Sequence, residues 1–334
     1  MQNRQIILKS RPVGRPTPAN FEFRPVEIPA PKEGELLLKS LYISVDPYMR
    51  GRMSDAKSYV EPYQVGEPIS GSVIAEVSES RYPDFAVGDV VVSRPLAWQE
   101  FQIAPAKSVR KIDKEEVPLS FYLGVLGMTG LTAYFGLKDI GQPKNGEAIV
   151  ISGAAGAVGT IAGQIAKIYG CHVVGIAGSE EKLRYLKDEL HFDEVINYRE
   201  EKNMEQAIAR ACPNGVDIYF DNVGGEISDA VMSNINKLAR IIICGQIALY
   251  NVTTVPTGPR IQPIILKKSA LMKGFIISDY IERFPEGMAK LTEWIKEGKL
   301  QHRETIIKGF DKLPEAFIGL FDGVNTGKLI VETK

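Results

Sequence analysis

The sequence predicts an α/β protein in which a doubly wound parallel sheet is joined to a β-rich region. Its 334 residues suggest two domains of ordinary size. Apolar residues make up 44% of the chain and charged residues 24%, values typical of globular proteins. The pattern of elements also changes along the chain. Short strands fill the first 116 residues, whereas strands alternate with helices from Glu147 onward.

The β-rich region is predicted from short apolar runs between turn residues. Glu35–Ser44, Ser70–Val77 and Val90–Ser93 are rich in Val, Ile and Leu, and Pro and Gly separate them. Short strands at this spacing are typical of a small barrel or sandwich.

The second region is predicted from the alternation of strands and helices. The expected strands are Ala148–Ile151, His172–Ile176, Val195–Asn197, Val216–Asp221, Leu238–Cys244 and Leu271–Ile277. The expected helices are Val158–Tyr169, Ser179–Leu190, Asn203–Ala211 and Arg283–Lys299, and the chain returns to a final strand at Lys328–Glu332. Such alternation predicts a parallel sheet that is covered on both faces.

Charge and cysteine content limit the possible partners and compartments. Lys and Arg number 40 and Asp and Glu 41, so we expect no general nucleic-acid binding, which needs a basic face. Cys171, Cys212 and Cys244 lie apart and form no C-x-x-C pair, which favours a reducing, cytoplasmic location. The charge-poor stretches 117–137 and 148–166 are Gly-rich, and we expect them to be buried in a protein core rather than in a membrane.

A glycine loop is the clearest motif of the chain. Residues 149–159 read Ile-Val-Ile-Ser-Gly-Ala-Ala-Gly-Ala-Val-Gly, between a predicted strand and a predicted helix. Gly156 would let the backbone approach a pyrophosphate, and Gly159 would let the helix pack close to the strand. Ala154 stands where such loops usually carry their first glycine. The loop predicts a dinucleotide site, and a tight turn without a ligand is the alternative.

The end of the next strand indicates which dinucleotide is bound. A site for NAD would carry a carboxylate there to accept a hydrogen bond from the ribose 2′-hydroxyl. This chain has no carboxylate before Glu180, and it offers Ser179 and Lys182 to a 2′-phosphate. NADPH is therefore favoured over NADH, although Glu180 and Glu181 also place negative charge nearby.

The β-rich region lacks the residue types that a catalytic zinc site of a dehydrogenase would need. The β-rich region contains neither Cys nor His, which excludes a zinc site built from that region. His172 is expected at a strand start, and His191 and His302 at the surface. Without a metal or a histidine base, hydride delivery to a conjugated double bond fits best, with a tyrosine to stabilise negative charge on oxygen.

Several segments together resemble the medium-chain dehydrogenase/reductase superfamily. Within it, the chain is similar to the zinc-free leukotriene 12-hydroxydehydrogenase/prostaglandin reductase group, which includes alkenal double-bond reductases and bacterial curcumin-reductase-like enzymes. The resemblance runs over nearly the whole chain. The segments that carry it are 44–50 (SVDPYMR), 127–134 (GMTGLTAY), 154–159, 177–182, 197–198, 219–225 (YFDNVGG), 243–251 (ICGQIALYN) and 325–329.

The resemblance implies a GroES-like catalytic β-barrel domain over residues 1–124, a Rossmann NADP-binding domain over 125–296 and a return to the catalytic domain over 297–334. It implies NADPH-dependent reduction of the double bond of α,β-unsaturated ketones or aldehydes, small molecules that would be the substrates. It also implies a homodimer that pairs the edge strands of the two Rossmann sheets, with Leu271–Ile277 as the candidate edge.

The resemblance further implies the residues of the site. Tyr250 is the candidate catalytic group, which would hydrogen-bond the substrate carbonyl or the enolate that develops from it; a tyrosine that only packs is the alternative. Tyr48 is a second candidate for contact with substrate, and a purely structural role in a turn is an equally weighted alternative. Arg50 is expected to be structural. The α-carbon proton would come from Tyr250 or from water. The cofactor candidates are Gly156, Ala157, Val158, Gly159, Ser179, Lys182, Tyr198, Asn222, Cys244, Gly245, Gln246, Ile247, Tyr250, Phe275, Ile276, Ile277 and Asn325.

Two other functions stay open at this point. A quinone reductase would share the glycine loop and the lack of zinc ligands, but Tyr250 and the D-P-Y-M-R run speak against it. A non-catalytic sensor or structural protein that binds NADPH would need Lys182 and Tyr198 but not Tyr250. The Pro- and Gly-rich loop Asn251–Ile264, expected to shape the substrate pocket, names no substrate.

Overall fold

The computed structural model describes residues 3–334, apart from the side chain of Arg94. The chain forms two compact units. The first unit contains the chain up to Leu123, together with Glu304–Asn325 and Leu329–Lys334. The second unit contains Gly124–Arg303 and Thr326–Lys328.

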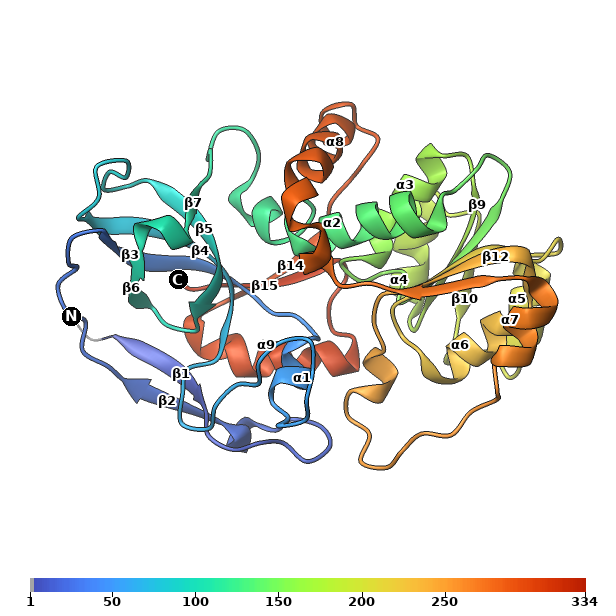
Figure 1. The fold of residues 1–334 in the computed structure, drawn as a ribbon, viewed down its shortest axis with the longest axis horizontal. Coiled ribbons are helices and arrows are strands. Elements are labelled where there is room, and N and C mark those ends of the chain that lie inside the picture. The colour runs from blue at the N-terminus through green and yellow to red at the C-terminus, as the bar shows by residue number, and fades with distance from the viewer. Residues whose placement is uncertain (1–2) are drawn as a thin grey trace. The chain divides into compact units, whose positions relative to one another are not determined.

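The first unit is built from antiparallel strands. The long strand β3 pairs with β4 on one side and, on the other, with β6 along its first half and β15 along its second half. The strand order is β14-β15-β3-β4-β5-β7, and β1 and β2 form a separate pair (Figure 1). The pairings within residues 3–334 describe an open path. The strands are β1 (Arg4–Leu8), β2 (Phe21–Pro25), β3 (Glu35–Ser44), β4 (Ser70–Ser80), β5 (Val90–Ala97), β6 (Phe101–Pro105), β7 (Arg110–Lys111), β14 (Glu304–Lys308) and β15 (Lys328–Glu332).

Aromatic side chains form the centre of the first unit. Trp98 stacks on Phe21 at 6.5 Å between ring centroids, and Phe317 from α9 (Leu313–Gly319) meets both rings edge-on. Burial of these large rings supplies much of the apolar driving force of the unit.

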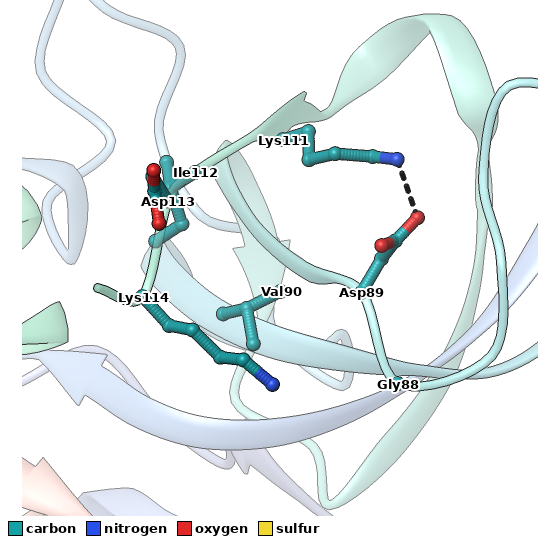
Figure 2. Close-up of a pocket in the computed structure, with 7 residues that line it drawn as sticks. All are labelled: Gly88, Asp89, Val90, Lys111, Ile112, Asp113 and Lys114. Atoms are coloured by element: carbon teal, nitrogen blue, oxygen red, sulfur yellow. Dashed lines mark ion pairs between the residues drawn. The ribbon is translucent and has the colours of Figure 1, made fainter. Parts of the chain in front are cut away.

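The first unit contains a small depression near the start of β5 and around β7 (Figure 2). Lys111 and Asp89 form an ion pair of 2.6 Å across it. None of the residues predicted for the site lines this depression, which is formed by Gly88, Asp89, Val90, Lys111, Ile112, Asp113 and Lys114.

The second unit is a six-stranded parallel sheet of order β10-β9-β8-β11-β12-β13. The chain starts in the middle of the sheet, moves out to one edge and then returns to build the other half. This is the doubly wound order that the strand–helix alternation predicts. The strands are β8 (Ala148–Ser152), β9 (His172–Ala177), β10 (Glu194–Asn197), β11 (Val216–Asp221), β12 (Ile235–Ile243) and β13 (Leu271–Gly274).

Helices cover both faces of this sheet (Figure 1). On one face, Val150 and Tyr219 pack in a core with side chains of α5, α6 and α7. On the other face, α3 contacts β8 and β9, and α2 joins α3 to α8. The helices are α2 (Met128–Phe135), α3 (Gly159–Ile168), α4 (Glu180–Arg184), α5 (Met204–Ala211), α6 (Gly225–Met232), α7 (Gln262–Lys268) and α8 (Phe284–Lys296). Both charge-poor stretches contribute buried residues, as predicted, and no helix of the described chain is long and apolar enough to span a bilayer.

Four expectations from the sequence are corrected. The strand expected over Leu238–Cys244 is β12, which begins at Ile235 because that residue already pairs with Val216 of β11. The last strand of the sheet ends at Gly274 and not at Ile277, because its partner β12 ends at Ile243, the residue that pairs with Gly274. The helix expected over Ser179–Leu190 is α4 followed by the π-helical segment η5 (Tyr185–Glu189). His302 is half-buried against Gly124 rather than at the surface, since a methyl group at Gly124 would lie 2.4 Å from its Nε2.

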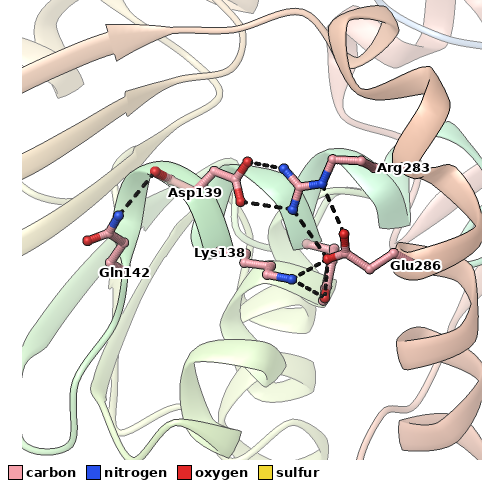
Figure 3. A network of polar contacts seen from close by, with 6 residues as sticks. Lys138, Asp139, Gln142, Arg283 and Glu286 are labelled. Atoms are coloured by element: carbon pink, nitrogen blue, oxygen red, sulfur yellow. Dashed lines mark hydrogen bonds and ion pairs between the residues drawn. The ribbon is translucent and has the colours of Figure 1, made fainter.

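A polar network ties the π-helical segment η4 (Gly136–Gly141), which follows α2, to the start of α8 (Figure 3). Arg283 donates to Asp139 at 2.5 Å and to Glu286 at 2.9 Å, and Lys138 forms an ion pair with the same Glu286. The guanidinium of Arg283 lies 4.9 Å from the ring centroid of Phe135. The network therefore lies beside the rings of Phe135 and Tyr280. It holds the end of the 3₁₀ segment η7 (Ile277–Arg283), which comes after the last strand of the sheet.

Candidate functional site

The predicted cofactor residues of the second unit follow the carboxyl ends of its strands. In a parallel sheet these ends lie along one edge, where open α/β sheets bind their ligands. The structure thus brings together segments that are far apart in the sequence, the first beginning at Gly156 and the last ending at Ile277. In chain order they are Gly156–Gly159 after β8, Ser179 and Lys182 after β9, Tyr198 after β10, Asn222 after β11, Cys244–Tyr250 after β12 and Phe275–Ile277 after β13.

The turn after β8 explains why alanine is tolerated at position 154. Gly153 has φ +59°, so the left-handed residue of the turn is Gly153, one position earlier than the usual motif suggests. Ala154 is fully buried, and its methyl group lies beside Gly175 of β9. Gly159 is required by packing, because a methyl group there would lie 2.4 Å from the carbonyl oxygen of Gly153.

The same loop presents donors without acceptors at a position that side chains leave free. A methyl group at Gly156 would meet only the carbonyl oxygen of Gly153, at 3.2 Å. The N–H groups of Ala157 and Val158, at the start of the ten-residue helix α3, have no acceptor among residues 3–334. Free N–H groups at a helix N-terminus attract an anion. The loop therefore fits the pyrophosphate of a dinucleotide.

A basic cluster lies at the ends of β9 and β10. Ser179 is the N-cap of α4 and accepts a hydrogen bond from the N–H of Lys182, as predicted for a helix start. The ring of Tyr198 lies directly on Gly178, where a methyl group would be 2.6 Å from Cε1. Burial lowers the pKa of Lys182, and the nearby guanidinium of Arg199 lowers it further, whereas Glu181 acts in the opposite direction. Two cations are therefore close to each other at the strand ends.

A buried aspartate organises the centre of the site. Asp221 is the last residue of β11 and has no exposed surface. Hydrogen-bond donors surround its carboxylate. Its main-chain carbonyl also accepts from the N–H groups of Cys244 and Gly245, at 2.9 and 3.0 Å. The ends of β11 and β12 are thus fixed to each other. The side-chain partners of Asp221 are Ser152 Oγ, Tyr219 Oη, the N–H groups of Val223 and Gly224, and Gln246 Nε2.

Tyr250 is held by the same loop. It follows the 3₁₀ turn η6 (Ile247–Leu249), and its hydroxyl oxygen accepts a hydrogen bond from the N–H of Gln246 at 3.4 Å. Burial raises the pKa of Tyr250, although the hydrogen bond from Gln246 partly offsets the increase. The phenol is therefore neutral at physiological pH, and its own proton is available for donation.

Asn222 and Cys244 follow the ends of β11 and β12, the strands that Asp221 joins. The side-chain amide of Asn222 donates to the carbonyl of Ser152 at 2.8 Å, which orients its side-chain oxygen. Burial raises the pKa of Cys244 to about 12. Cys244 is therefore a neutral thiol at physiological pH.

The segment Phe275–Ile277 follows β13 at the edge of the sheet. The ring of Phe275 points into the unit, where a methyl group at Gly136 would lie 3.0 Å from its Cζ, and it meets Tyr280 edge-on at 6.0 Å. Ile276 is the N-cap of η7, and Ile277 is the first residue of that turn.

Tyr48, Arg50 and Asn325 belong to the first unit and are not among the residues that the parallel sheet gathers. Tyr48 is the N-cap of the short helix α1 (Met49–Arg52) and packs against the core of its unit. Arg50 is buried and donates to the carbonyl of Gly14 at 2.8 Å, a structural contact as predicted. Asn325 precedes the segment in which Gly327 donates to the carbonyl of Ala155 in the glycine loop.

Two parts of the site were not predicted from the sequence. Asp221 was treated only as a strand end, although an aspartate before Asn-Val-Gly-Gly is a signal for side-chain hydrogen bonds to the following turn. Arg199 was also missed, although a cation directly after the predicted Tyr198 is visible in the sequence. In the described part of the chain no three Cys, His, Asp or Glu side chains are grouped as metal ligands.

Comparisons with known proteins agree with this geometry. Residues 4–112 match a family model described as the N-terminal domain of oxidoreductase, and residues 157–294 match one described as zinc-binding dehydrogenase. The chain is 55% identical to the putative NADP-dependent oxidoreductase YfmJ of Bacillus subtilis, with 98% of this chain and 97% of the relative covered. It is 44% identical to the NADPH-dependent curcumin reductase of Escherichia coli, with 99% and 96% covered.

A solved structure gives the same result. The crystal structure of CurA from Vibrio vulnificus in complex with NADPH superposes with a TM-score of 0.95 at 46% identity and covers 99% of both chains. The resemblance predicted from the motifs is confirmed. The chain belongs to the medium-chain dehydrogenase/reductase superfamily, within its alkenal and prostaglandin reductase group.

Proposed function

We propose that this protein reduces the carbon–carbon double bond of α,β-unsaturated ketones or aldehydes with NADPH. The loop after β8 carries the proposal: no side chain lies within 4 Å of a methyl group placed at Gly156, and the N–H groups of Ala157 and Val158 lack acceptors in the described chain. The names of two relatives, the NADPH-dependent curcumin reductase and the 2-alkenal reductase of Nicotiana tabacum, support the same reaction class.

The residues after the six strands would hold the cofactor along its length. Gly156–Gly159 would bind the pyrophosphate, and Ser179, Lys182 and Tyr198 the 2′-phosphate. The remaining candidates would line the nicotinamide end, and Asn325 would complete it. They are Asn222, Cys244, Gly245, Gln246, Ile247, Tyr250, Phe275, Ile276 and Ile277. When bound, the nicotinamide supplies a hydride to the β-carbon of the substrate.

Tyr250 would act on the substrate oxygen. Its hydroxyl oxygen accepts from the N–H of Gln246, so its proton can be donated to the substrate carbonyl. Negative charge that develops on this oxygen would be stabilised by a donor whose position is already fixed. The α-carbon would then take its proton from Tyr250 or from water. Tyr48 is the second candidate for contact with substrate.

We further propose the organisation of the whole protein. The first unit would be a GroES-like catalytic β-barrel domain and the second a Rossmann NADP-binding domain; division at Leu123 and Arg303 supports this. The position of β13 at the sheet edge supports a homodimer. Three free cysteines and a reduced cofactor support a cytoplasmic location. The lack of Cys and His before residue 171 supports a reaction without metal.

NADPH oxidation by the purified protein tests the activity after treatment with a chelator. The acceptors would be a 2-alkenal, a long-chain enone, curcumin and a quinone, each also assayed with NADH. We expect turnover of the enone or enal with NADPH that survives chelation. Turnover of the quinone alone would assign a quinone reductase instead. NADPH binding without turnover of any acceptor would favour a non-catalytic NADPH-binding protein.

A further inference from the structure

We propose that Arg199 is a second cation for the 2′-phosphate of NADPH and helps to select NADPH over NADH. The inference rests on the proposed NADPH-dependent function and adds a residue to it. Position 199 directly follows Tyr198, at the carboxyl end of the edge strand β10.

Strand pairing places Arg199 at the basic cluster. β9 and β10 are neighbours, and their last residues, Ala177 and Asn197, are paired in register. The residues that follow each strand are therefore adjacent as well. The ring of Tyr198 lies on Gly178, and the guanidinium of Arg199 is 5.7 Å from the centroid of that ring. Arg199 is also close enough to Lys182 for the two charges to repel.

The acidic residues next to Arg199 are engaged by other partners. Glu200 accepts a hydrogen bond from the side-chain amide of Asn197 at 2.8 Å. Glu201 forms an ion pair of 2.7 Å with Arg210. Within residues 3–334, the guanidinium of Arg199 forms no ion pair.

The acid beside Lys182 is also drawn toward another cation. Glu181 lies 3.9 Å from Arg303, which approaches Glu189 at 3.4 Å and stacks over the ring of Tyr185. The two cations at the strand ends therefore lie close enough for Arg199 to lower the pKa of Lys182, while the nearby acids contact other cations. Negative charge at Glu181 would repel a 2′-phosphate nearby. In the structure the carboxylate of Glu181 lies near the guanidinium of Arg303.

A phosphate monoester is a ligand that would offset the repulsion between Lys182 and Arg199. It carries a charge of about −1.5 to −2 at neutral pH. A guanidinium offers several donors in a plane that suits phosphate oxygens. NADH has a hydroxyl group at the same position and would gain nothing from a second cation. Arg199 would therefore affect NADPH binding and leave NADH binding unchanged.

Binding of two adenosine nucleotides tests this role without the reductase reaction. 2′,5′-ADP carries the 2′-phosphate and 5′-AMP lacks it, so calorimetric titration of both isolates the contribution of that phosphate. The variants would be Arg199→Ala, Arg199→Lys and, as a control, Arg184→Ala. Arg184 is an exposed arginine of α4 and does not contribute to the electrostatics of Lys182. Steady-state kinetics with NADPH and NADH would accompany the titrations.

We expect Arg199→Ala to weaken 2′,5′-ADP binding about five- to tenfold, as for a partly exposed charge-assisted contact, and to leave 5′-AMP binding unchanged. KM for NADPH would rise with kcat unchanged, Arg199→Lys would retain most of the affinity, and Arg184→Ala would match the wild type. Unchanged 2′,5′-ADP binding in Arg199→Ala, or an equal loss for both nucleotides, would overturn the role of Arg199. A wild-type protein that binds both nucleotides equally would instead contradict the NADPH assignment itself.

Discussion

At the scale of single residues, the site depends on one buried carboxylate. Asp221 receives donors from its own strand end, from Ser152 of β8 and from Gln246 after β12. An unpaired buried acid is unfavourable, whereas a fully satisfied one fixes the groups around it. The positions of Asn222, Gln246 and Tyr250 therefore follow from the polar contacts of a residue that need not touch substrate.

Replacing Tyr250 with Phe tests the proposed donor. The change removes one hydroxyl group, and its loss from a site that stabilises negative charge on oxygen should lower kcat for an enone about 10- to 100-fold. KM for NADPH should stay near the wild-type value. Steady-state kinetics give both constants, and Tyr169→Phe, on the exposed side of the same unit, is the control. Unchanged kcat in Tyr250→Phe would assign this tyrosine to packing.

Residue identity alone could not reveal the contacts of Asp221 and Arg199. Asp221 and Gln246 are 25 positions apart and meet only because β11 and β12 are neighbours in the sheet. Arg199 meets the cluster of Ser179 and Lys182 because β9 and β10 are neighbours. The glycine loop could be predicted because all of its determinants lie within eleven consecutive residues.

At the scale of elements, strands were predicted well and their ends less well. The runs Glu35–Ser44, Val216–Asp221 and Lys328–Glu332 are strands with the bounds that their apolar residues indicate. The end of β13 is set by its partner β12, which local sequence does not contain. The π-helical continuation of α4 likewise has no simple signal in the sequence.

Gly163 in the middle of α3 should resist substitution by alanine. A methyl group there would lie 1.9 Å from Cζ of Phe192, whose ring is buried and also lies against Gly175 of β9. Alanine gains about 1 kcal/mol of helix propensity, but overpacking of this contact costs more, typically about 1–3 kcal/mol. We expect a net loss of stability, seen as a lower thermal midpoint.

Two further variants make the test of Gly163 specific. Gly274→Ala should leave the midpoint near that of the wild type, because nothing lies within 4 Å of the added methyl group. A shorter side chain in Phe192→Leu should recover part of the loss when combined with Gly163→Ala, since the two sites are in contact. A wild-type midpoint for Gly163→Ala alone would show that the ring of Phe192 can move.

The ion pair of Glu147 and Arg240 should stabilise the second unit in a pH-dependent way. Both side chains are mostly buried, and they meet at 2.6 Å. Burial raises the pKa of Glu147, but hydrogen bonds from Arg240 and from the N–H of Lys144 outweigh it, so the net pKa is lowered. A lowered pKa in the folded state stabilises the fold above the unfolded pKa, and this contribution is lost as the pH falls through the folded pKa.

We therefore expect Glu147→Gln to destabilise the protein by about 1–2 kcal/mol at pH 7. The difference from the wild type should shrink below about pH 4, as protonation removes the charge in the wild type also. Urea unfolding at several pH values measures this. Glu297→Gln, which removes an exposed partner of Lys299, should cost under about 0.5 kcal/mol. A pH-independent effect of Glu147→Gln would contradict the electrostatic explanation.

At the scale of the whole molecule, the order of elements was predictable because two periodicities are separated along the chain. Strand-only and strand–helix patterns occupy different parts of the sequence, and each part forms its own compact unit. The return of Glu304–Asn325 to the first unit could be placed only through the family resemblance, because nothing in local composition links it to the first 123 residues.

The exposed edge of the second sheet makes a prediction about assembly. β13 pairs with β12 on one side, and no strand of the described chain covers its other side. Leu271 of this strand is 48% exposed. An uncovered apolar edge strand is a site for pairing with another chain, and a two-fold axis would pair it with its own copy.

Sedimentation equilibrium at micromolar concentration should therefore give twice the chain mass of 36.8 kDa. Leu271→Arg would place like charges across the two-fold axis and should shift the mass toward that of one chain. The fold should be unaffected, because the replaced side chain is already half exposed. Leu266→Arg, on the exposed face of α7, is the matched control and should leave the mass unchanged. A wild-type protein that sediments as a single chain would exclude pairing through β13 at that concentration.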